Sequence, residues 1–226
     1  MRLLSILLST LFCVTSYSPL LAQSDIAVVT LVAGDKYKKT VSSGVENKRL
    51  YCQQHGYDFI CGGKSLDRSR PIPWTKILII LQTMENSNYQ WIFWTDADSL
   101  IMNMSFKLED FIQESENNLI LTKDISNINT GEFFIRNCEW SRNFLKAVYG
   151  HTECINDAWW EQQGLINELE KNPEWWSLIE VIPQRLINSY ISNYEEDDFI
   201  IHFAGVHNPK ILKGLMEKYA NKSNFL

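Results

Sequence analysis

The sequence predicts an α/β protein built on a central β-sheet with helices on both faces. Short β-branched or aromatic runs alternate with longer segments of helical periodicity along most of the chain, as in sheets covered by helices. The 226 residues suit one ordinary domain, and 45% apolar against 21% charged residues exclude disorder as the main state. The chain has no evident repeat or linker, so we expect residues 23–226 to form a single domain.

The predicted strands are apolar runs that stop at turn residues. The run Ile26–Val32 is almost entirely β-branched and ends just before Gly34 and Asp35, a pattern that favours a buried strand and its turn. Further strands are predicted at Tyr57–Cys61, Trp91–Thr95, Leu119–Thr122, Gly131–Ile135 and Phe199–Ala204.

The predicted helices follow the 3.6-residue period. A helix over Thr40–His55 is closed by Gly56, a natural C-terminal stop. The next begins at Trp74, and one apolar stripe, expected to be core, contains Trp74, Ile77, Leu78, Leu81 and Met84. Further helices are predicted at Trp140–Tyr149, Glu161–Lys171 and Pro209–Tyr219.

The first 22 residues predict a targeting segment. Arg2 precedes the apolar stretch Leu3–Val14, and Ala22 stands just before polar residues; these are the parts of a signal peptide, and we expect cleavage near Gln23. The alternatives are a signal anchor that tethers the protein to a membrane and a first buried element of the fold. No apolar run reaches 18 residues, which excludes a protein with several membrane spans.

The cysteines allow disulfides in a secretory context. Cys13 lies in the targeting segment, which leaves Cys52, Cys61, Cys138 and Cys154. Four cysteines permit two disulfides with three connectivities. Cys52 and Cys61 border the same predicted strand, so we expect them to be the pair if one forms.

The net charge and the aromatic content indicate which ligands the protein can bind. The net charge of −6, without basic runs, argues against a nucleic-acid binder. Aromatic residues reach 12%, with 8 tryptophans. A tryptophan-rich core explains this content, and so does stacking against the flat faces of sugar rings; burial statistics favour the core.

Two aspartates follow the most apolar predicted strand. Asp96 and Asp98 come directly after Trp91–Thr95, and ligands of α/β proteins bind outside the carboxyl ends of strands. Carboxylates spaced in this way can hold Mg²⁺ or Mn²⁺, a cation that neutralises the charge of a departing nucleoside diphosphate. A capped loop after the strand is the structural alternative.

Several ordered motifs resemble glycosyltransferase family 34, the galactosyl-, mannosyl- and xylosyltransferases. The similarity covers nearly all of residues 26–207. It rests on Asp96–Asp98 after Trp91–Trp94, Tyr51–Asp58, Trp74–Ile77, Asn129–Gly131 with Ile135–Asn137 and Trp140–Ser141, Glu161–Gln162, Gln184–Tyr190 and His202–Gly205. Motifs in register are far more specific than any one alone.

The resemblance implies a GT-A-like fold, the nucleotide-diphospho-sugar transferase fold with a mixed, mostly parallel sheet. It implies that Asp96, Asp98 and His202 hold Mn²⁺ (or Mg²⁺), and that Glu161 and Gln162 lie near the reacting sugar carbon. The donor-binding residues that it implies are Lys76, Asp96, Asn129, Thr130, Gly131 and Gly205. For Glu161, the roles of nucleophile, electrostatic stabiliser, acceptor-orienting group and ordinary helix N-terminal acid all stay open.

The predicted activity is metal-dependent transfer, with retention of configuration, of a hexose from a nucleotide-diphosphate sugar to a glycan acceptor. Galactose or mannose is favoured over xylose, because Gln184–Tyr190 resembles the fungal members more closely. A catalytically silent nucleotide-sugar or glycan-binding relative is the first alternative, and a glycoside hydrolase with paired carboxylates is the second. Nucleotide sugars are imported into the Golgi and endoplasmic reticulum, so these lumens, or secretion, are the expected location.

Overall fold

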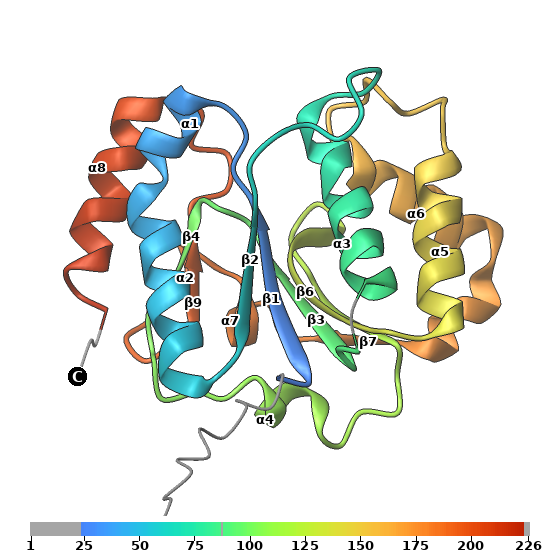
Figure 1. Ribbon diagram of the computed structural model, residues 1–226, viewed down its shortest axis with the longest axis horizontal. Coiled ribbons are helices and arrows are strands. Elements are labelled where there is room, and N and C mark those ends of the chain that lie inside the picture. Colours follow the sequence, from blue (N-terminus) through green and yellow to red (C-terminus); the bar gives the residue numbers. More distant parts are fainter. Residues whose placement is uncertain (1–23, 87, 224–226) are drawn as a thin grey trace, which may run out of the picture.

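Six of the chain's apolar runs pair into one mixed sheet. The computed structural model describes residues 24–86 and 88–223, and its main sheet has the order β2–β1–β3–β6–β5–β7 (Figure 1). Strand β1 is parallel to β2 and β3, β6 is antiparallel to β3 and β5, and β7 is parallel to β5. The strand bounds are Ile26–Leu31 (β1), Asp58–Gly62 (β2), Trp91–Thr95 (β3), Leu119–Lys123 (β5), Ile128–Arg136 (β6) and Ile179–Ile182 (β7).

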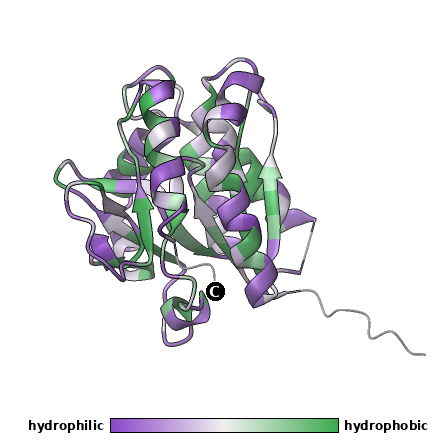
Figure 2. Ribbon diagram, turned by 90° about the vertical axis from the view of Figure 1, so that its left-hand side faces the viewer, coloured by the Kyte–Doolittle hydropathy of each residue, from purple (hydrophilic) through white to green (hydrophobic). Residues whose placement is uncertain are grey.

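Alternate residues of the central strands supply two different cores. Ala27 and Val29 of β1 pack beneath the helices of one face, while Ile26 and Val28 face the opposite layer. Figure 2 shows the apolar strands between helices whose outer surfaces are largely hydrophilic. Because both faces are covered, β1 and β3 are apolar apart from one threonine each, instead of alternating with polar residues.

Helices of the two layers lie on either side of the sheet in Figure 1. One layer holds α3 (Thr75–Glu85), α5 (Glu139–Gly150) and α6 (Glu161–Lys171). The other holds α1 (Asp35–Thr40), α2 (Ser42–His55) and α8 (Pro209–Ala220). Short segments complete the described chain: 3-10 helices at Ile72–Trp74 and Pro173–Leu178, α4 (Glu109–Ile112) and α7 (Gln184–Ile187).

A small second sheet positions the end of β3. Its strands are β4 (Ser99–Ile101), β8 (Ser189–Tyr190) and β9 (Ile200–His202), in the order β4–β9–β8. Strand β4 pairs antiparallel with β9, and Ser99 lies opposite His202. This pairing brings the chain just after β3 against a segment about a hundred residues later.

The helix predicted over Thr40–His55 is α2, which begins at Ser42, and a helix that was not predicted, α1, precedes it. α1 and α2 are separated at Val41, whose backbone (φ −101°, ψ 15°) leaves the helical region. Val41 is fully buried, so its apolar side chain fits the helical pattern although its backbone breaks it. Local periodicity could not reveal this break.

The predicted core position of Leu78 is wrong. Leu78 is only half-buried, whereas Ile77, Ile79 and Ile80 are buried. Helix α3 packs on β1 and β3 on one side and on α5 on another. A helix covered on several sides has no single apolar stripe, so the residues between the stripe positions are buried as well.

The disulfide expected between Cys52 and Cys61, if any formed, is not present. All four cysteines of the described chain are free, and Cys52 is buried in the core while Cys61 is exposed on the edge strand β2. The two side chains therefore face different surroundings. The predicted targeting segment lies outside the described residues, and none of the helices described here is long and apolar enough to cross a bilayer.

Candidate active site

A deep cleft opens where β1 and β3 end and antiparallel β6 begins. Its volume is about 1080 Å³. One wall comes from the turn after β1 and from α1, and the other from residues 158–162 at the start of α6. Every predicted site residue lines this cleft: Lys76, Asp96, Asp98, Asn129, Thr130, Gly131, Glu161, Gln162, His202 and Gly205.

Two carboxylates and an imidazole converge on the cleft floor. One ligand atom each from Asp96, Asp98 and His202 lies within 4.8 Å of the other two. His202 Nε2 is 3.6 Å from Asp98 Oδ1 and 4.0 Å from Asp96 Oδ2. Asp96 and Asp98 stand in the turn between β3 and β4, and His202 ends β9, so the β4–β9 pairing assembles the group. Such a donor set suits a divalent cation such as Mn²⁺.

The imidazole of His202 is held with Nε2 toward the carboxylates. Asn188 donates from Nδ2 to Asn129 and Thr122, so its Oδ1 accepts from His202 Nδ1 at 2.9 Å. The lone pair of His202 then lies on Nε2, the atom nearest the two aspartates. A hydrogen bond of this kind fixes the tautomer and orientation of a metal-binding histidine.

Gly131 makes room for that ring. A Cβ on Gly131 would lie 2.4 Å from His202 Cε1 and 2.8 Å from Nδ1. No real Cβ makes such contacts, so the imidazole fits here only because the residue has no side chain.

The charges of the triad reinforce one another. Burial penalises ionisation of both Asp98 and His202, yet the Asp98 carboxylate raises the pKa of His202, and His202 lowers the pKa of Asp98. The negative charge at this point is thus kept under conditions in which an isolated buried carboxyl would be protonated.

Lys76 links the aspartate to the opposite wall. Its Nζ is 2.7 Å from Glu161 Oε1 and 3.3 Å from Asp96 Oδ1, and it donates to the Thr130 carbonyl at 2.8 Å. Although burial acts against the ammonium, Asp96 and Glu161 raise the pKa of Lys76. Burial raises the pKa of Glu161, and Lys76 opposes that rise. Lys76 is therefore a buried cation with three fixed acceptors, rather than a solvated helix lysine.

The predicted donor-binding segment Asn129–Gly131 is held by hydrogen bonds to Glu161 and Gln162 and to Tyr190. Thr130 donates its backbone N–H to Gln162 Oε1 at 3.0 Å, and its hydroxyl donates to Glu161 Oε1 at 3.3 Å. The side-chain oxygen of Asn129 accepts a hydrogen bond from the Gly131 N–H, and its side-chain amide donates to the Tyr190 hydroxyl. The Asn129 side chain thus holds the turn, and a direct contact with a bound sugar would compete with these bonds.

Several cleft residues were not predicted from the sequence. Tyr37 of α1 borders the cleft, and burial, with Asp98 and Asp96 nearby, raises the pKa of its hydroxyl. Trp159 and Trp160 form the opposite lip. The only sequence signal for them is position, because they directly precede Glu161.

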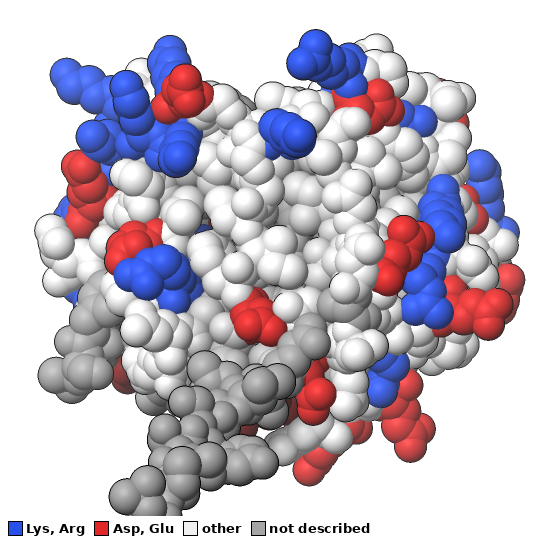
Figure 3. Space-filling view, viewed as in Figure 1, with Lys and Arg blue, Asp and Glu red and all other residues white. Residues whose placement is uncertain are grey.

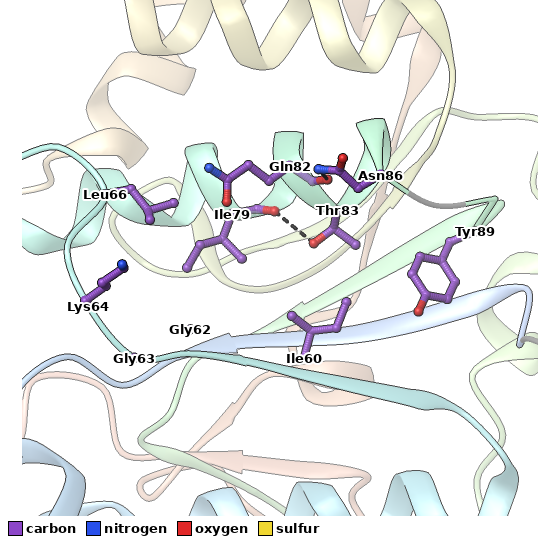
Figure 4. A pocket seen from close by; sticks show the side chains of 10 residues that line it. All are labelled: Ile60, Gly62, Gly63, Lys64, Leu66, Ile79, Gln82, Thr83, Asn86 and Tyr89. Carbon is purple, nitrogen blue, oxygen red and sulfur yellow. Dashed lines mark hydrogen bonds between the residues drawn. The ribbon is translucent and has the colours of Figure 1, made fainter.

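A second pocket lies between β2 and α3 and has different chemistry. It measures about 450 Å³ and is lined by side chains such as Ile60, Leu66 and Ile79 (Figure 4). Among the described residues that line it, Lys64 is the one charged side chain, and no carboxylate faces it. The acid-rich cleft is therefore the candidate active site.

Comparison with known proteins agrees with this geometry. The sequence profile of the galactosyl transferase GMA12/MNN10 family matches residues 22–117 and 111–210. The chain belongs to this family. The family described here is the one that the sequence motifs resemble.

Relatives in the GMA12/MNN10 family use different sugars. The chain is 26% identical to an alpha-1,2-galactosyltransferase of Schizosaccharomyces pombe over 78% of its length and 59% of the relative. It is 25% identical to a probable alpha-1,6-mannosyltransferase of Saccharomyces cerevisiae over 77% of its length and 58% of the relative. A probable xyloglucan 6-xylosyltransferase of Arabidopsis thaliana is 32% identical over 50% of the chain and 26% of the relative. The chain thus spans somewhat more than half of the yeast relatives.

Solved structures establish the GT-A fold of this family member. A glycosyltransferase involved in glycosylation of the major capsid of PBCV-1 superposes with a TM-score of 0.70 at 20% identity, over 85% of this chain and 98% of that one. The predicted GT-A-like fold, with its mixed and mostly parallel sheet, is confirmed.

Proposed function

We propose that this protein is a metal-dependent, retaining hexosyltransferase that transfers galactose or mannose from a nucleotide-diphosphate sugar to a glycan acceptor. The observation that carries the proposal is the Asp96–Asp98–His202 triad on the floor of a cleft that is large enough for a nucleotide sugar. Membership of a galactosyl transferase family supports the reaction class.

The residues of the triad fit Mn²⁺ or Mg²⁺. Two carboxylates and an oriented imidazole offer hard oxygen ligands and one nitrogen. The imidazole can take this position only because residue 131 is a glycine. A cation bound there would take up the charge that develops on a departing diphosphate.

The wall that contains Glu161 would face the reacting carbon of the sugar. Glu161 Oε1 forms an ion pair with Lys76 and accepts a hydrogen bond from the Thr130 hydroxyl. The buried Oε2 has no hydrogen-bond partner among the described residues. A carboxylate held in this way suits electrostatic stabilisation of an oxocarbenium-like centre. Gln162 fixes Thr130 through its Oε1 and lines the cleft beside it.

The geometry gives less support to a glycoside hydrolase. Hydrolases place two carboxyl groups on opposite sides of the scissile bond. Here Asp96 and Asp98 converge on one point together with His202, and Glu161 is paired with Lys76.

The proposed location is a secretory-pathway lumen, because nucleotide-sugar donors are supplied there. Residues 1–22 would direct the chain to that lumen or tether it to the membrane.

Ligand-dependent thermal stability tests the proposal and identifies the nucleotide. A ligand that binds only the native protein raises Tm. We expect Mn²⁺ with UDP or Mn²⁺ with GDP to raise Tm well above the value with Mn²⁺ alone, and the matching sugar nucleotide to be slowly hydrolysed. Stabilisation by neither nucleotide would contradict the proposal, and binding without any hydrolysis or transfer would favour the catalytically silent relative.

Substitution of the aspartates tests the metal site. Asp96→Asn or Asp98→Asn removes one ligand charge with little change in shape, so we expect at least a hundredfold loss of donor hydrolysis and loss of the Mn²⁺-dependent rise in Tm, while the metal-free variant stays folded. Glu109→Gln, on α4 and outside the cleft, is the control carboxylate. Full activity of both aspartate variants in the presence of a chelator would rule out the metal site.

A further inference from the structure

Two tryptophans at the mouth of the cleft are unusually exposed. Trp159 and Trp160 expose 48% and 40% of their surface, whereas the other six tryptophans of the chain are buried or half-buried. Both line the cleft, on the wall that also carries Glu161. An indole left in water forfeits its large burial energy, so a pair at a cleft mouth points to a ligand that covers them.

The backbone under this pair is strained. Trp160 has φ 45° and ψ −121°, a conformation that bulky L-residues rarely adopt and that costs free energy. The only other described non-glycine residue with positive φ is Asp197. The strain turns the chain sharply at the residue before α6, so that the indole of Trp160 and the carboxylate of Glu161 border the same cleft.

Hydrogen bonds hold the loop in this shape. Trp159 N–H donates to Asp157 Oδ1 at 2.9 Å, and Trp160 N–H donates to the Asp157 carbonyl at 3.2 Å. Buried Trp74 donates from Nε1 to the Ile155 carbonyl at 3.0 Å. The loop thus holds Trp159 and Trp160 as a preorganised aromatic platform, which reduces the conformational entropy lost when a ligand binds.

The two walls of the cleft differ in charge. The wall formed by α1 carries Asp35 and Lys36, and Figure 3 shows Lys and Arg side chains gathered over α1 and the neighbouring α8 at the upper left. The facing lip consists of Ile72, Pro73 and Ala158 together with the two tryptophans, all uncharged. A charged nucleotide suits the first wall, and a neutral ligand with apolar faces suits the second.

We propose that Trp159 and Trp160 form the acceptor subsite, on which the C–H faces of pyranose rings of a neutral glycan stack. This inference rests on the proposed glycosyl transfer. Trp160 is bonded to Glu161, and consecutive Cα atoms are only 3.8 Å apart, so a sugar on this platform lies beside the proposed reaction centre. The hydroxyls on the ring edges stay free to approach the donor sugar.

Oligosaccharide binding to the full chain loaded with Mn²⁺ and its nucleotide tests the subsite. The probes are α-1,6-mannotriose, α-galactobiose and cellotetraose, followed by saturation-transfer NMR and calorimetry. We expect at least one probe to bind, and Trp159→Ala and Trp160→Gly each to weaken that binding, or raise the KM for that acceptor, at least tenfold. The Kd for the nucleotide should change less than twofold. Trp160→Phe should retain most of the affinity.

Two features separate binding from folding. Glycine accepts the backbone angles of Trp160, so Trp160→Gly removes the ring and relieves strain, and its Tm should not fall. Trp176→Ala is the aromatic control, because Trp176 lies outside the cleft and stacks with Lys123; it should leave oligosaccharide binding unchanged.

The outcomes distinguish the two proposals. If the nucleotide binds but no probe does, or if probe binding survives both substitutions, the acceptor subsite is wrong and the transferase proposal stands. If the wild-type protein binds neither UDP nor GDP with Mn²⁺, the proposed function itself fails.

Discussion

At the residue scale, the chemistry of the cleft depends on side chains whose orientation is fixed by neighbours. Asn188 sets the tautomer of His202, and Lys76 holds Asp96 and Glu161 on either side of its ammonium. Gly131 contributes by having no side chain, because the ring of His202 occupies the space where a Cβ would be. A site built in this way is sensitive to changes that add or remove a single carbon.

The substitution Gly131→Ala should therefore lower metal affinity. Its Cβ would displace the imidazole, and shifting a ligand or the group that orients it commonly costs 10–100-fold in affinity. Calorimetric titration with Mn²⁺ measures this directly. Gly214→Ala is the matched control, because Gly214 lies in α8 with open space around it and should be neutral or slightly stabilising. Unchanged Mn²⁺ affinity in Gly131→Ala would show that the ring does not bind the cation.

At the element scale, helices complete the small sheet and protect the core. Asn47 of α2 donates to the Ile101 carbonyl and accepts from the Ile101 N–H, and Lys48 donates to the Ser99 carbonyl at 2.6 Å. The open edge of β4 is thus satisfied by helix side chains instead of another strand. Helix α2 thereby fixes the strand that follows Asp98.

Two nearby positions of helix α3, Leu78 and Ile80, should differ in how much they contribute to the stability of the protein. Ile80 is fully buried and Leu78 is half-buried. We expect Ile80→Ala to lower the free energy of unfolding by about 2–5 kcal/mol, the usual penalty for a large-to-small core change, and Leu78→Ala to cost distinctly less. Denaturant unfolding of both variants provides the comparison. Equal losses would mean that Leu78 is as well packed as Ile80.

At the scale of the whole molecule, the structure accommodates a buried acid between the sheet and the small-sheet layer. Glu132 of β6 is fully buried, and neither carboxylate oxygen has a hydrogen-bond partner among the described residues. Burial raises the pKa of Glu132 to about 8, against the opposing effects of His202 and Lys48. The folded protein therefore holds a proton that the unfolded chain releases at a much lower pH.

This difference makes the stability of the protein depend on pH. The proton on Glu132 contributes stability that is fully present below the ordinary pKa of a glutamate and is lost as pH rises through about 8. Relative to Glu132→Gln, the wild-type protein should lose roughly 1 kcal/mol of unfolding free energy per pH unit between pH 5 and 8. Urea unfolding of both proteins across this range, with a chelator present, measures the difference. Parallel pH profiles would mean that Glu132 titrates normally.

The sequence by itself determined the fold class, the succession along the chain of the main strands and helices other than β7 and α1, and the motifs of the cleft. Runs such as Ile26–Val32 and Trp91–Thr95 are almost entirely apolar, because both faces of their sheet are covered. Asp96 and Asp98 were predictable because they are separated by a single residue and directly follow such a run. Such patterns involve residues that are close together in the sequence, so they can be recognised without the structure.

Only the tertiary structure decided which distant residues meet. Lys76 of α3 lies against Glu161 of α6, because both helices cover the same face of the main sheet. Asn188 lies against His202, because β8 and β9 pair in the small sheet. The same holds for the break at Val41, the half-burial of Leu78, the separation of Cys52 from Cys61, and the exposure of Trp159 and Trp160. Burial and exposure depend on what packs against a residue, and for these residues that neighbour lies far away in the sequence.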